Sequence, residues 1–410
     1  MSIFTPSHTA TYLDGCHRSV IAQTHRDWEW IVLLNGSAEW EPPEPDPRIR
    51  VVRGESTGNV GAAKREACAL AAGEVLVELD HDDVLASNCL EELVSVFTDD
   101  HEAVLAYSDF AQINADGSAN YDKFNLAMGW TYASDDVDGL RVNRCHALEP
   151  SPHNVSYIWY APNHVRAFRR SAYEKVGGYD PALEVLDDQD LMMRLYEIGD
   201  FVRIPHCLYL QRIHESNTQR DKRINKHIQT DTVARYHRGI RTLATAWSRR
   251  NGLAALDLRV PEWPGEPADD LTPVDIDPQE PRLPCPDESV GVVVATELLQ
   301  RIPDRRALFE ELHRVLVHGG LVLTTTPSTD GRGAFQDPTH VSFWNQNSFW
   351  YLTQRQLRDR VFPGSSMRFQ VSALRTYFPT DFDKTHNIAY VGANLLAVRS
   401  GPRHGGPLLS

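Results

Sequence analysis

The sequence has no apolar run approaching the roughly 20 residues that an α-helix needs to cross a bilayer. Its first residues, MSIFTPSHTATY, also lack the basic segment followed by an apolar segment that is typical of a signal peptide. From these two absences we expect a cytoplasmic protein without a membrane span.

Paired cysteines and an excess of positive charge are missing as well. The six cysteines stand singly, with no CxxC spacing, which argues against a zinc site and against a disulfide framework. The 41 Lys and Arg residues are outnumbered by 56 Asp and Glu residues, which gives a formal net charge of -15. This balance disfavours non-specific attraction to nucleic acid or to an anionic membrane.

What the first half does contain is an alternation of short apolar runs with helix-forming stretches, the pattern of a parallel sheet covered by helices. Strands are expected at Trp28–Asn35 and Glu74–Leu79, and the alanine-rich segment Gly61–Ala72 is expected to be a helix. The proline-rich segment Glu41–Pro47 can be neither a helix nor a central strand. A length of 410 residues suits two domains.

The second half begins with polar and proline-rich sequence. The stretch Asn217–Arg250 has apolar residues at spacings of mostly three and four, which predicts an amphipathic helix with a basic outer face. Proline, Asp and Glu then dominate Pro261–Pro286, as is typical of a domain boundary. Beyond it, strands are expected at Val290–Thr296 and Leu321–Pro327, joined by a helix that stops at Gly319–Gly320.

Three carboxylates crowd the four consecutive positions Asp80, His81, Asp82 and Asp83, which follow an apolar run. Because like charges this close repel, the cluster needs a cation, a basic partner or water. We expect it at the carboxyl edge of a parallel sheet, where open α/β proteins bind ligands, with Asp80 and Asp82 pointing to one side. Its oxygen ligands suit Mg²⁺ or Mn²⁺ bound to a nucleoside diphosphate, although a D-x-D pair by itself favours a surface turn.

Four segments then occur in order: SIFTPSHTATYLDGCHRSVIAQTHRDWEWIVLLNGS, VGAAKREACALAAGEVLVELDHDDVL, FRRSAYEKVGGYDPALEVLDDQDLMMRL and QRIHESNTQ. Together they make the chain from Met1 to about Arg250 similar to a family 2 glycosyltransferase with the GT-A fold. The resemblance implies an α/β domain that binds a nucleotide sugar and an enzyme of the hexosyltransferase type.

On the nucleotide side, the resemblance places Thr5 and Pro6 where the first strand closes over the nucleotide. Asn35 stands where the family usually has an Asp that touches the base, and an amide offers a donor as well as an acceptor, which allows a different base preference. Lys64 replaces a common Arg and is either a partner of the diphosphate or an exposed helix lysine.

For the metal, the resemblance implies that Asp80 contacts the ribose or the cation and that Asp82 ligates Mn²⁺ or Mg²⁺. His214 matches a position that is often a further ligand, although a lone histidine is more often structural. The cation would offset the charge that develops on the leaving diphosphate.

On the acceptor side, Asp187 and Asp188 begin an expected helix, where acidic residues are favourable whatever the function. The resemblance singles out Asp188 as the general base for the acceptor hydroxyl, and it places Asp187 and Gly178 beside the acceptor. Trp159 is either a surface for stacking a sugar or part of the core. The acidic run DDVD at residues 135–138 is expected to be a solvated loop.

Residues from Leu256 to about Thr353 resemble a class I methyltransferase that uses S-adenosylmethionine, through LDL, VDIDP, LPCPDESVGVVVATELLQRIPD, ELHRVLVHGGLVLTTTPS and DPTHVSFWNQNSFWYLT. After LDL, however, RVPEWPGEP replaces the glycine-rich turn of that family, and other residues resist the backbone that such a turn requires. Gln300 and Arg301 also replace a usual Glu-His pair. Asp275 or Asp277 still allows ribose binding, but S-adenosylmethionine is not the expected cofactor.

We therefore expect a GT-A domain at residues 1–250, a smaller Rossmann-like domain without catalysis at 251–400, and a disordered tail at 401–410. The second domain would orient the acceptor or mediate assembly, including homo-oligomer formation. The aromatic residues of 343–351 would form either its core or a contact surface, and the core is expected.

The expected activity is metal-dependent, inverting transfer from a nucleoside diphosphate sugar to a hydroxyl acceptor. That acceptor is a glycan, a glycoprotein, a small molecule or, less readily, a modified nucleic-acid base. Two alternatives stay open: methyl transfer from S-adenosylmethionine to a sugar or nucleoside, and binding of a glycan or nucleotide without catalysis.

Overall fold

The computed structural model of the chain describes residues 1–55, 59–124, 126, 129–157, 163–215, 217, 239–261 and 269–399. The chain divides into two compact units, Met1–Arg238 and Gly239–Ser410. Within the described residues, no helix is both long enough and apolar enough to span a membrane.

The first unit has a mixed α/β composition. Its strands are β1 (Ser2–Ser7), β2 (Glu29–Leu34), β3 (Ile49–Arg53), β4 (Val75–Glu78), β5 (Val84–Leu85), β6 (Ala103–Asn114), β7 (Ala119–Asn120), β8 (Thr131–Val137), β9 (Leu140–His146), β10 (Arg166–Arg169) and β11 (Asp200–Ile213). Its helices are α1 (Leu13–Ile21), α2 (Val60–Ala69), α3 (Cys89–Asp99), α4 (Pro152–Tyr157), α5 (Arg170–Lys175) and α6 (Asp187–Ile198).

The main sheet of this unit has the strand order β3-β2-β1-β4-β10-β6-β11-β5. Since β1 pairs in parallel with both β2 and β4, the carboxyl ends of these three strands meet at one edge. Antiparallel β10 lies between β4 and β6 and starts at that same edge, opposite Glu78. The expected strands at Trp28–Asn35 and Glu74–Leu79 are confirmed as β2 and β4, so the acidic cluster follows a buried strand.

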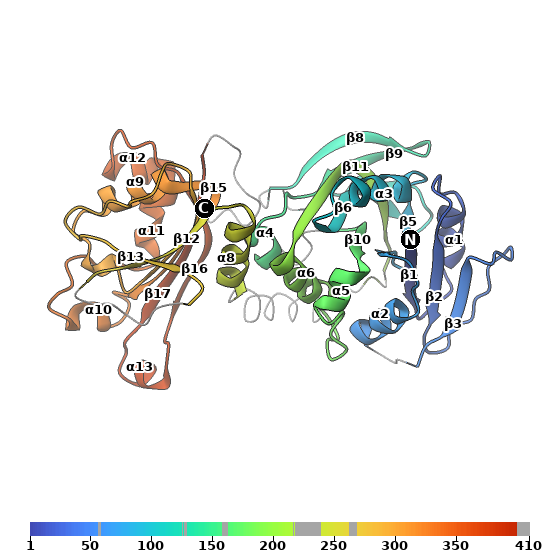
Figure 1. Ribbon diagram of the computed structural model, residues 1–410, viewed down its shortest axis with the longest axis horizontal. Helices are drawn as coiled ribbons and strands as arrows, with labels where there is room; N and C mark the ends of the chain where they lie inside the picture. The colour runs from blue at the N-terminus through green and yellow to red at the C-terminus, as the bar shows by residue number, and fades with distance from the viewer. Residues whose placement is uncertain are drawn as a thin grey trace. The chain divides into compact units, whose positions relative to one another are not determined.

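Helices cover both faces of this sheet. Figure 1 shows α2, α5 and α6 together on one side, with α1 and α3 on the other. The expected helix at Gly61–Ala72 is confirmed as α2, which Asn59 caps by accepting a hydrogen bond from the Ala62 N–H at 3.2 Å. Gly61 lies so close to the carbonyl oxygen of Asp180 that a Cβ atom would clash with it. This close approach sets α2, and with it Lys64, against the segment that leads to α6.

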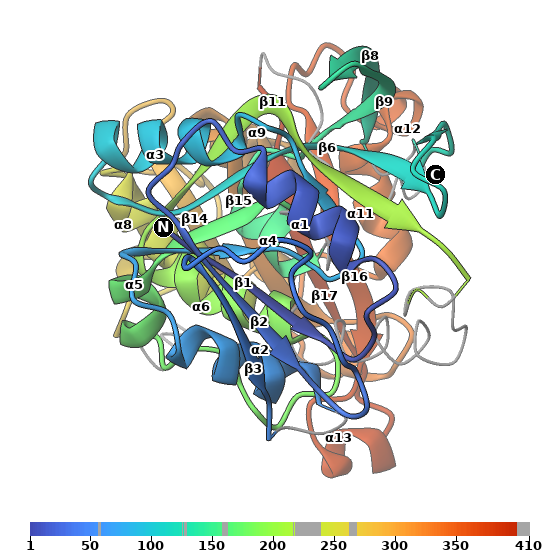
Figure 2. The same ribbon diagram turned by 90° about the vertical axis from the view of Figure 1, so that its right-hand side faces the viewer.

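The acidic run at residues 135–138 differs from its expected loop. Asp135 and Asp136 belong to strand β8, which pairs with β9 in an antiparallel ribbon (Figure 2). The ribbon turns at Asp138 and Gly139, which have φ angles of 52° and 85°. The loop was predicted from the run of acidic residues, but a strand at the edge of a sheet tolerates acidic side chains on its solvent face.

The second unit is also mixed α/β. Its strands are β12 (Ala254–Arg259), β13 (Thr272–Asp275), β14 (Val290–Thr296), β15 (Leu316–Pro327), β16 (Phe369–Tyr377) and β17 (Tyr390–Ala397). Its helices are α8 (Ile240–Arg250), α9 (Arg305–Val315), α10 (Gly333–Gln336), α11 (Gln346–Thr353), α12 (Arg355–Val361) and α13 (Asp381–Thr385).

The sheet of the second unit has the order β13-β12-β14-β15-β17-β16. Its first four strands run parallel, and β17 is antiparallel to both of its neighbours. In Figure 1, α8 lies on one side of this sheet, and α9 and α11 lie on the other. This arrangement is the expected Rossmann-like one, with β14 at the expected strand Val290–Thr296.

Two boundaries differ from their predicted positions. The division of the chain falls before α8, earlier than residue 250, because α8 packs against β12 and β14 of the second sheet. Helix α9 ends at Val315, and Gly319–Gly320 lie inside β15, so they do not stop the helix. Of the amphipathic helix expected at Asn217–Arg250, α8 is confirmed, while 218–238 and the tail 401–410 lie outside the described residues.

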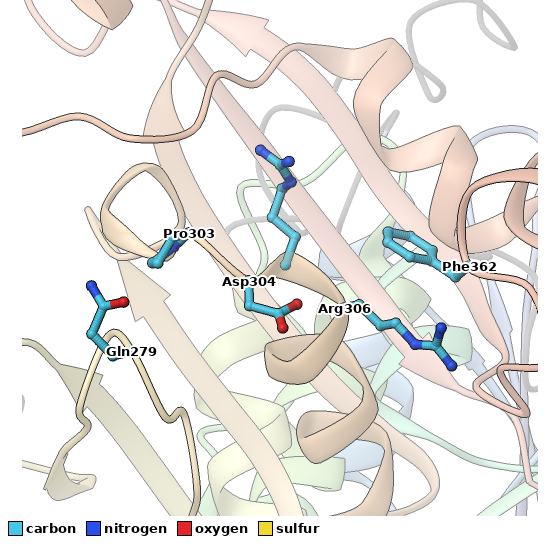
Figure 3. A pocket seen from close by; sticks show the side chains of 6 residues that line it. Gln279, Pro303, Asp304, Arg306 and Phe362 are labelled. Atoms are coloured by element: carbon cyan, nitrogen blue, oxygen red, sulfur yellow. The ribbon is translucent and has the colours of Figure 1, made fainter.

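The aromatic run at residues 343–351 divides between core and surface. Trp344 and Phe349 are buried as expected, but Phe343 and Tyr351 are 49% and 39% exposed. Those two rings border a hollow of about 350 Å³ that Arg305 also lines. A second hollow of about 380 Å³, drawn in Figure 3, shares Arg305 with the first and is lined mainly by polar side chains from the start of α9.

Candidate active site

The acidic cluster after β4 forms a tight turn. The Asp83 N–H donates to the carbonyl oxygen of Asp80 at 3.2 Å, and the buried Asp83 carboxylate accepts from the Arg212 N–H at 2.6 Å. The expectation of an extended backbone at Asp80–Asp82 is therefore wrong, because these residues lie in a turn. Each carboxylate has its own partner.

Asp82 faces His214, which directly follows β11. Their Oδ2 and Nε2 atoms lie 2.7 Å apart, and both side chains are nearly buried. The antiparallel pairing of β11 with β5 brings the two residues together, although they are far apart in the sequence. The Arg212 guanidinium donates to the carbonyl oxygen of Asp82 at 2.7 Å, and the Asp82 carboxylate lies beside the imidazole.

One carboxylate oxygen and one imidazole nitrogen at this separation fit a divalent cation. The Asn217 amide approaches the same Asp82 oxygen at 3.2 Å. Such a set leaves most coordination positions for phosphate and water, as Mg²⁺ and Mn²⁺ prefer in nucleotide sites.

A second group of potential ligands fits a cation poorly. Glu78, Asp80 and His164 offer ligand atoms within 4.8 Å of one another. Glu78, however, is already bound by Lys64 at 2.6 Å and by Arg166 at 2.9 Å. The Arg166 guanidinium lies 2.6 Å from His164 Nε2. Because a guanidinium can only donate hydrogen bonds, this contact uses the nitrogen lone pair that a metal would need.

The residues expected on the nucleotide side lie at the carboxyl ends of β1 and β2. Thr5 is buried, and its hydroxyl accepts a hydrogen bond from the Trp30 indole at 2.9 Å, so this side chain ties β1 to β2. Pro6 is partly buried in the same strand. The Asn35 N–H donates to the Ser7 carbonyl at 2.7 Å, which fixes Asn35 just beyond the end of β2.

Lys64 is a buried cation between two carboxylates. Its ammonium group lies 2.6 Å from Glu78 and 3.0 Å from Asp187, so the alternative of an exposed helix lysine is wrong. Burial opposes the charge, but Asp187 and Glu78 outweigh that effect and raise the pKa of Lys64 well above its ordinary value. Burial also raises the pKa of Asp187, despite its contact with Lys64.

Arg166 links Glu78 to Asp188. Its guanidinium donates to Glu78 at 2.9 Å and to Asp188 Oδ2 at 2.8 Å. Burial disfavours the charged form of Asp188, but Arg166 and Lys64 outweigh burial and lower its pKa. Asp188 stands in the first turn of α6, and its side chain is 27% exposed, so it can meet a ligand in its ionised form.

The segment before α6 depends on a glycine. Gly178 has a φ of 70°, and a Cβ atom there would lie 2.7 Å from the ring of Tyr173. Only glycine therefore suits this turn, which leads the chain toward Asp187 and Asp188. Trp159 lies outside the described residues.

Sequence reasoning missed Glu78, Arg166 and His164 as parts of the site. The one available signal was Glu78, a carboxylate inside the apolar run VLVEL. A buried glutamate needs a cation, but the run itself does not say which of the chain's 41 basic residues supplies it.

The corresponding edge of the second unit offers fewer available groups. Asp257, near the end of β12, is paired with Arg259 at 2.7 Å. The buried Gln300 amide donates to Glu297 at 2.7 Å and accepts from Thr326 at 2.6 Å. Asp277 accepts from the Gln279 N–H at 2.8 Å, and residues 262–268, where the glycine-rich turn would stand, lie outside the described residues.

Comparison with known proteins agrees with both resemblances. Residues 2–177 match the family model described as glycosyl transferase family 2, and residues 265–324 match a model described as methyltransferase domain. The O-antigen biosynthesis protein RfbC of Myxococcus xanthus is 28% identical over 206 residues, which are 48% of this chain and 14% of that protein. A chondroitin synthase of Pasteurella multocida is 24% identical over 225 residues, which are 53% of this chain and 21% of that protein.

Among solved structures, that of S. aureus TarS 1-349 in complex with UDP-GlcNAc has a TM-score of 0.42 and 12% identity. The match covers 61% of this chain and 71% of that one. The chain itself spans only about a fifth or less of the length of the two curated relatives above.

Residues 2–177 thus form a family 2 glycosyltransferase domain, and residues 265–324 belong to a methyltransferase domain. The expected fold, a GT-A-type α/β unit followed by a smaller Rossmann-like unit, is confirmed, and so is the class of enzyme to which the first domain belongs.

Proposed function

We propose that the chain is a metal-dependent, inverting glycosyltransferase that uses a nucleoside diphosphate sugar. One observation carries the proposal: a continuous series of side-chain contacts connects the candidate base, Asp188, with Asp80 in the acidic turn. Asp188 contacts Arg166 at 2.8 Å, and Arg166 contacts His164 at 2.6 Å. His164 in turn lies 3.4 Å from the Asp80 carboxylate. These contacts support one site that contains both the proposed base and the turn that carries Asp82.

Asp82 and His214 would hold the cation, which is Mn²⁺ or Mg²⁺. The bound cation offsets negative charge on the leaving diphosphate. Asp80 would contact the ribose, and Asn35, with the backbone at Thr5 and Pro6, would contact the base at the ends of the strands.

In the proposed reaction, the acceptor hydroxyl oxygen attacks the anomeric carbon as the bond from that carbon to the diphosphate oxygen breaks. Asp188 takes the hydroxyl proton, and the diphosphate leaves with the bonding electron pair. A single displacement of this kind inverts the anomeric centre. The names of the relatives, an O-antigen biosynthesis protein and a chondroitin synthase, favour a glycan as the acceptor.

A panel of nucleotide sugars with Mn²⁺ tests the proposal through donor hydrolysis. The wild-type protein is expected to hydrolyse at least one donor, and Asp82→Asn is expected to lose this activity. Asp188→Asn should reduce transfer to a glycan by about 10²- to 10⁴-fold while donor binding is retained. Asp122→Asn, at an exposed site, is the matched control. If the wild-type protein hydrolyses none of the donors in the panel, the result would contradict the proposal and favour a binding role.

For the second unit, we propose a part in acceptor binding without methyl transfer. At its cofactor edge, the Asp257 carboxylate is neutralised by Arg259 and the Gln300 amide is engaged with its neighbours. One of its two hollows instead combines exposed aromatic rings, from Phe343 and Tyr351, with the Arg305 guanidinium. Aromatic faces beside polar groups suit a carbohydrate ligand.

A further inference from the structure

We propose that Arg166 is a positioning residue that holds the carboxylate of Asp188 for proton abstraction, and that the buried Glu78 limits how strongly it does so. This inference rests on the proposed function of Asp188 as the base. It assigns a role in the reaction to two residues that do not reach the substrate themselves.

The geometry of Arg166 is fixed by the sheet. Arg166 opens β10 directly opposite Glu78 in the antiparallel pairing with β4, so the two side chains meet at 2.9 Å. Both are almost fully buried, with side-chain exposures of 3% and 1%. An arginine in this setting cannot swing away, because its removal would leave the Glu78 charge uncompensated on that side.

Because Arg166 is held, Asp188 is held as well. One of its oxygens accepts from the guanidinium at 2.8 Å, and the other accepts from the Gln189 N–H at 2.7 Å. Two hydrogen bonds to different oxygens fix the plane of the carboxylate. A base that is fixed in this way loses little freedom when the acceptor hydroxyl arrives.

Charged groups from β10, α2, β4 and α6 surround Asp188. Arg166 on β10 and Lys64 on α2 stabilise its anion, whereas Glu78 on β4 and the adjacent Asp187 carry like charge. Glu78 is in contact with both cations, at 2.6 Å from Lys64 and 2.9 Å from Arg166. It therefore moderates their effect on the base, which would otherwise become a weaker proton acceptor.

This arrangement predicts shifts of opposite sign for two substitutions. A base must be ionised, so the rate falls as pH falls through its pKa. Arg166→Gln removes a positive charge and should move the acidic limb of the kcat/KM profile to higher pH by about one unit. Glu78→Gln removes a negative charge and should move the same limb to lower pH. A purely structural role for the two residues would lower the rate at every pH without opposite shifts.

Two further variants separate the effect of the Arg166 charge from the effect of its geometry and from a general loss of a buried ion pair. Arg166→Lys keeps the positive charge but not the forked geometry, so it should leave the acidic limb near that of wild type while kcat falls. Arg203→Gln is the matched control, because Arg203 also pairs with a buried carboxylate, Asp109, at 2.7 Å but has no contact with Asp188. It should leave the limb in place.

A readout that needs no turnover accompanies these profiles. The carboxyl carbon of Asp188 can be titrated by NMR in protein labelled at Asp, with its signal assigned by its loss in Asp188→Asn. Opposite shifts of this titration in Arg166→Gln and Glu78→Gln are the expected result. Equal or absent shifts in folded variants would overturn the inference even if the wild type transfers sugar. Opposite shifts in a protein without transferase activity would instead reject the proposed function alone.

Discussion

At the carboxyl edges of the two sheets of this protein, an aspartate side chain has a different partner in each unit. In the first unit, the Asp82 carboxylate faces the His214 imidazole at 2.7 Å, and both are groups that can ligate a divalent cation. In the second unit, Asp257 is neutralised by Arg259 at 2.7 Å. Both units have parallel strands that end at such an edge, so the fold alone does not decide which edge is a reaction site. The two edges differ in the partner of the aspartate, which is an imidazole in the first unit and a guanidinium in the second.

The largest effect on this comparison is expected from removing a proposed metal ligand. If Asp82 and His214 hold the cation as proposed, His214→Ala leaves only Asp82 of this pair, so the Mn²⁺ concentration for half-maximal donor hydrolysis should rise by at least about 10-fold. The measurement is a Mn²⁺ titration after treatment with EDTA. His101→Ala, at an exposed histidine, is the control. An unchanged Mn²⁺ requirement would show that His214 is only a structural partner of Asp82.

A smaller effect is expected where the chain turns toward α6. Gly178→Ala and Gly139→Ala both place a side chain at a left-handed φ, of 70° and 85°, but only Gly178 faces a ring. The free energy of unfolding should fall by about 1 kcal/mol in Gly139→Ala from backbone strain alone. It should fall by about 1 to 3 kcal/mol more in Gly178→Ala because of the clash with Tyr173. Urea denaturation measures both, and equal losses would contradict the packing argument.

The smallest expected effect concerns the second unit. Phe343→Ala should raise the KM for a glycan acceptor by about 2- to 10-fold through loss of one stacking face, with the KM for the donor unchanged. Phe378→Ala, at another exposed phenylalanine of this unit, is the control. S-adenosylmethionine should leave the Tm unchanged. A rise in Tm on addition of S-adenosylmethionine would favour methyl transfer, and both sheet edges would then be ligand sites.

Much of the first unit could be predicted from local sequence. The apolar runs around Trp30 and Val77 indicated strands β2 and β4, and the position of Asp80 after a buried run indicated the ligand edge. The turn at Asp80–Asp83 and the strand at Asp135–Asp136 could not be predicted in this way. Hydrogen bonds to Arg212 decide the first, and pairing with β9 decides the second.

The sequence by itself determined which segments are buried and which residue types stand at their ends, because burial and turn formation depend on neighbouring side chains. Tertiary structure alone decided that Glu78 meets Lys64 and Arg166, and that Asp82 meets His214. These pairs join residues far apart in the chain, and nothing in the local sequence selects one distant cation or ligand over another. The packing of α2 on β1, the pairing of β4 with β10 and the pairing of β5 with β11 make that selection.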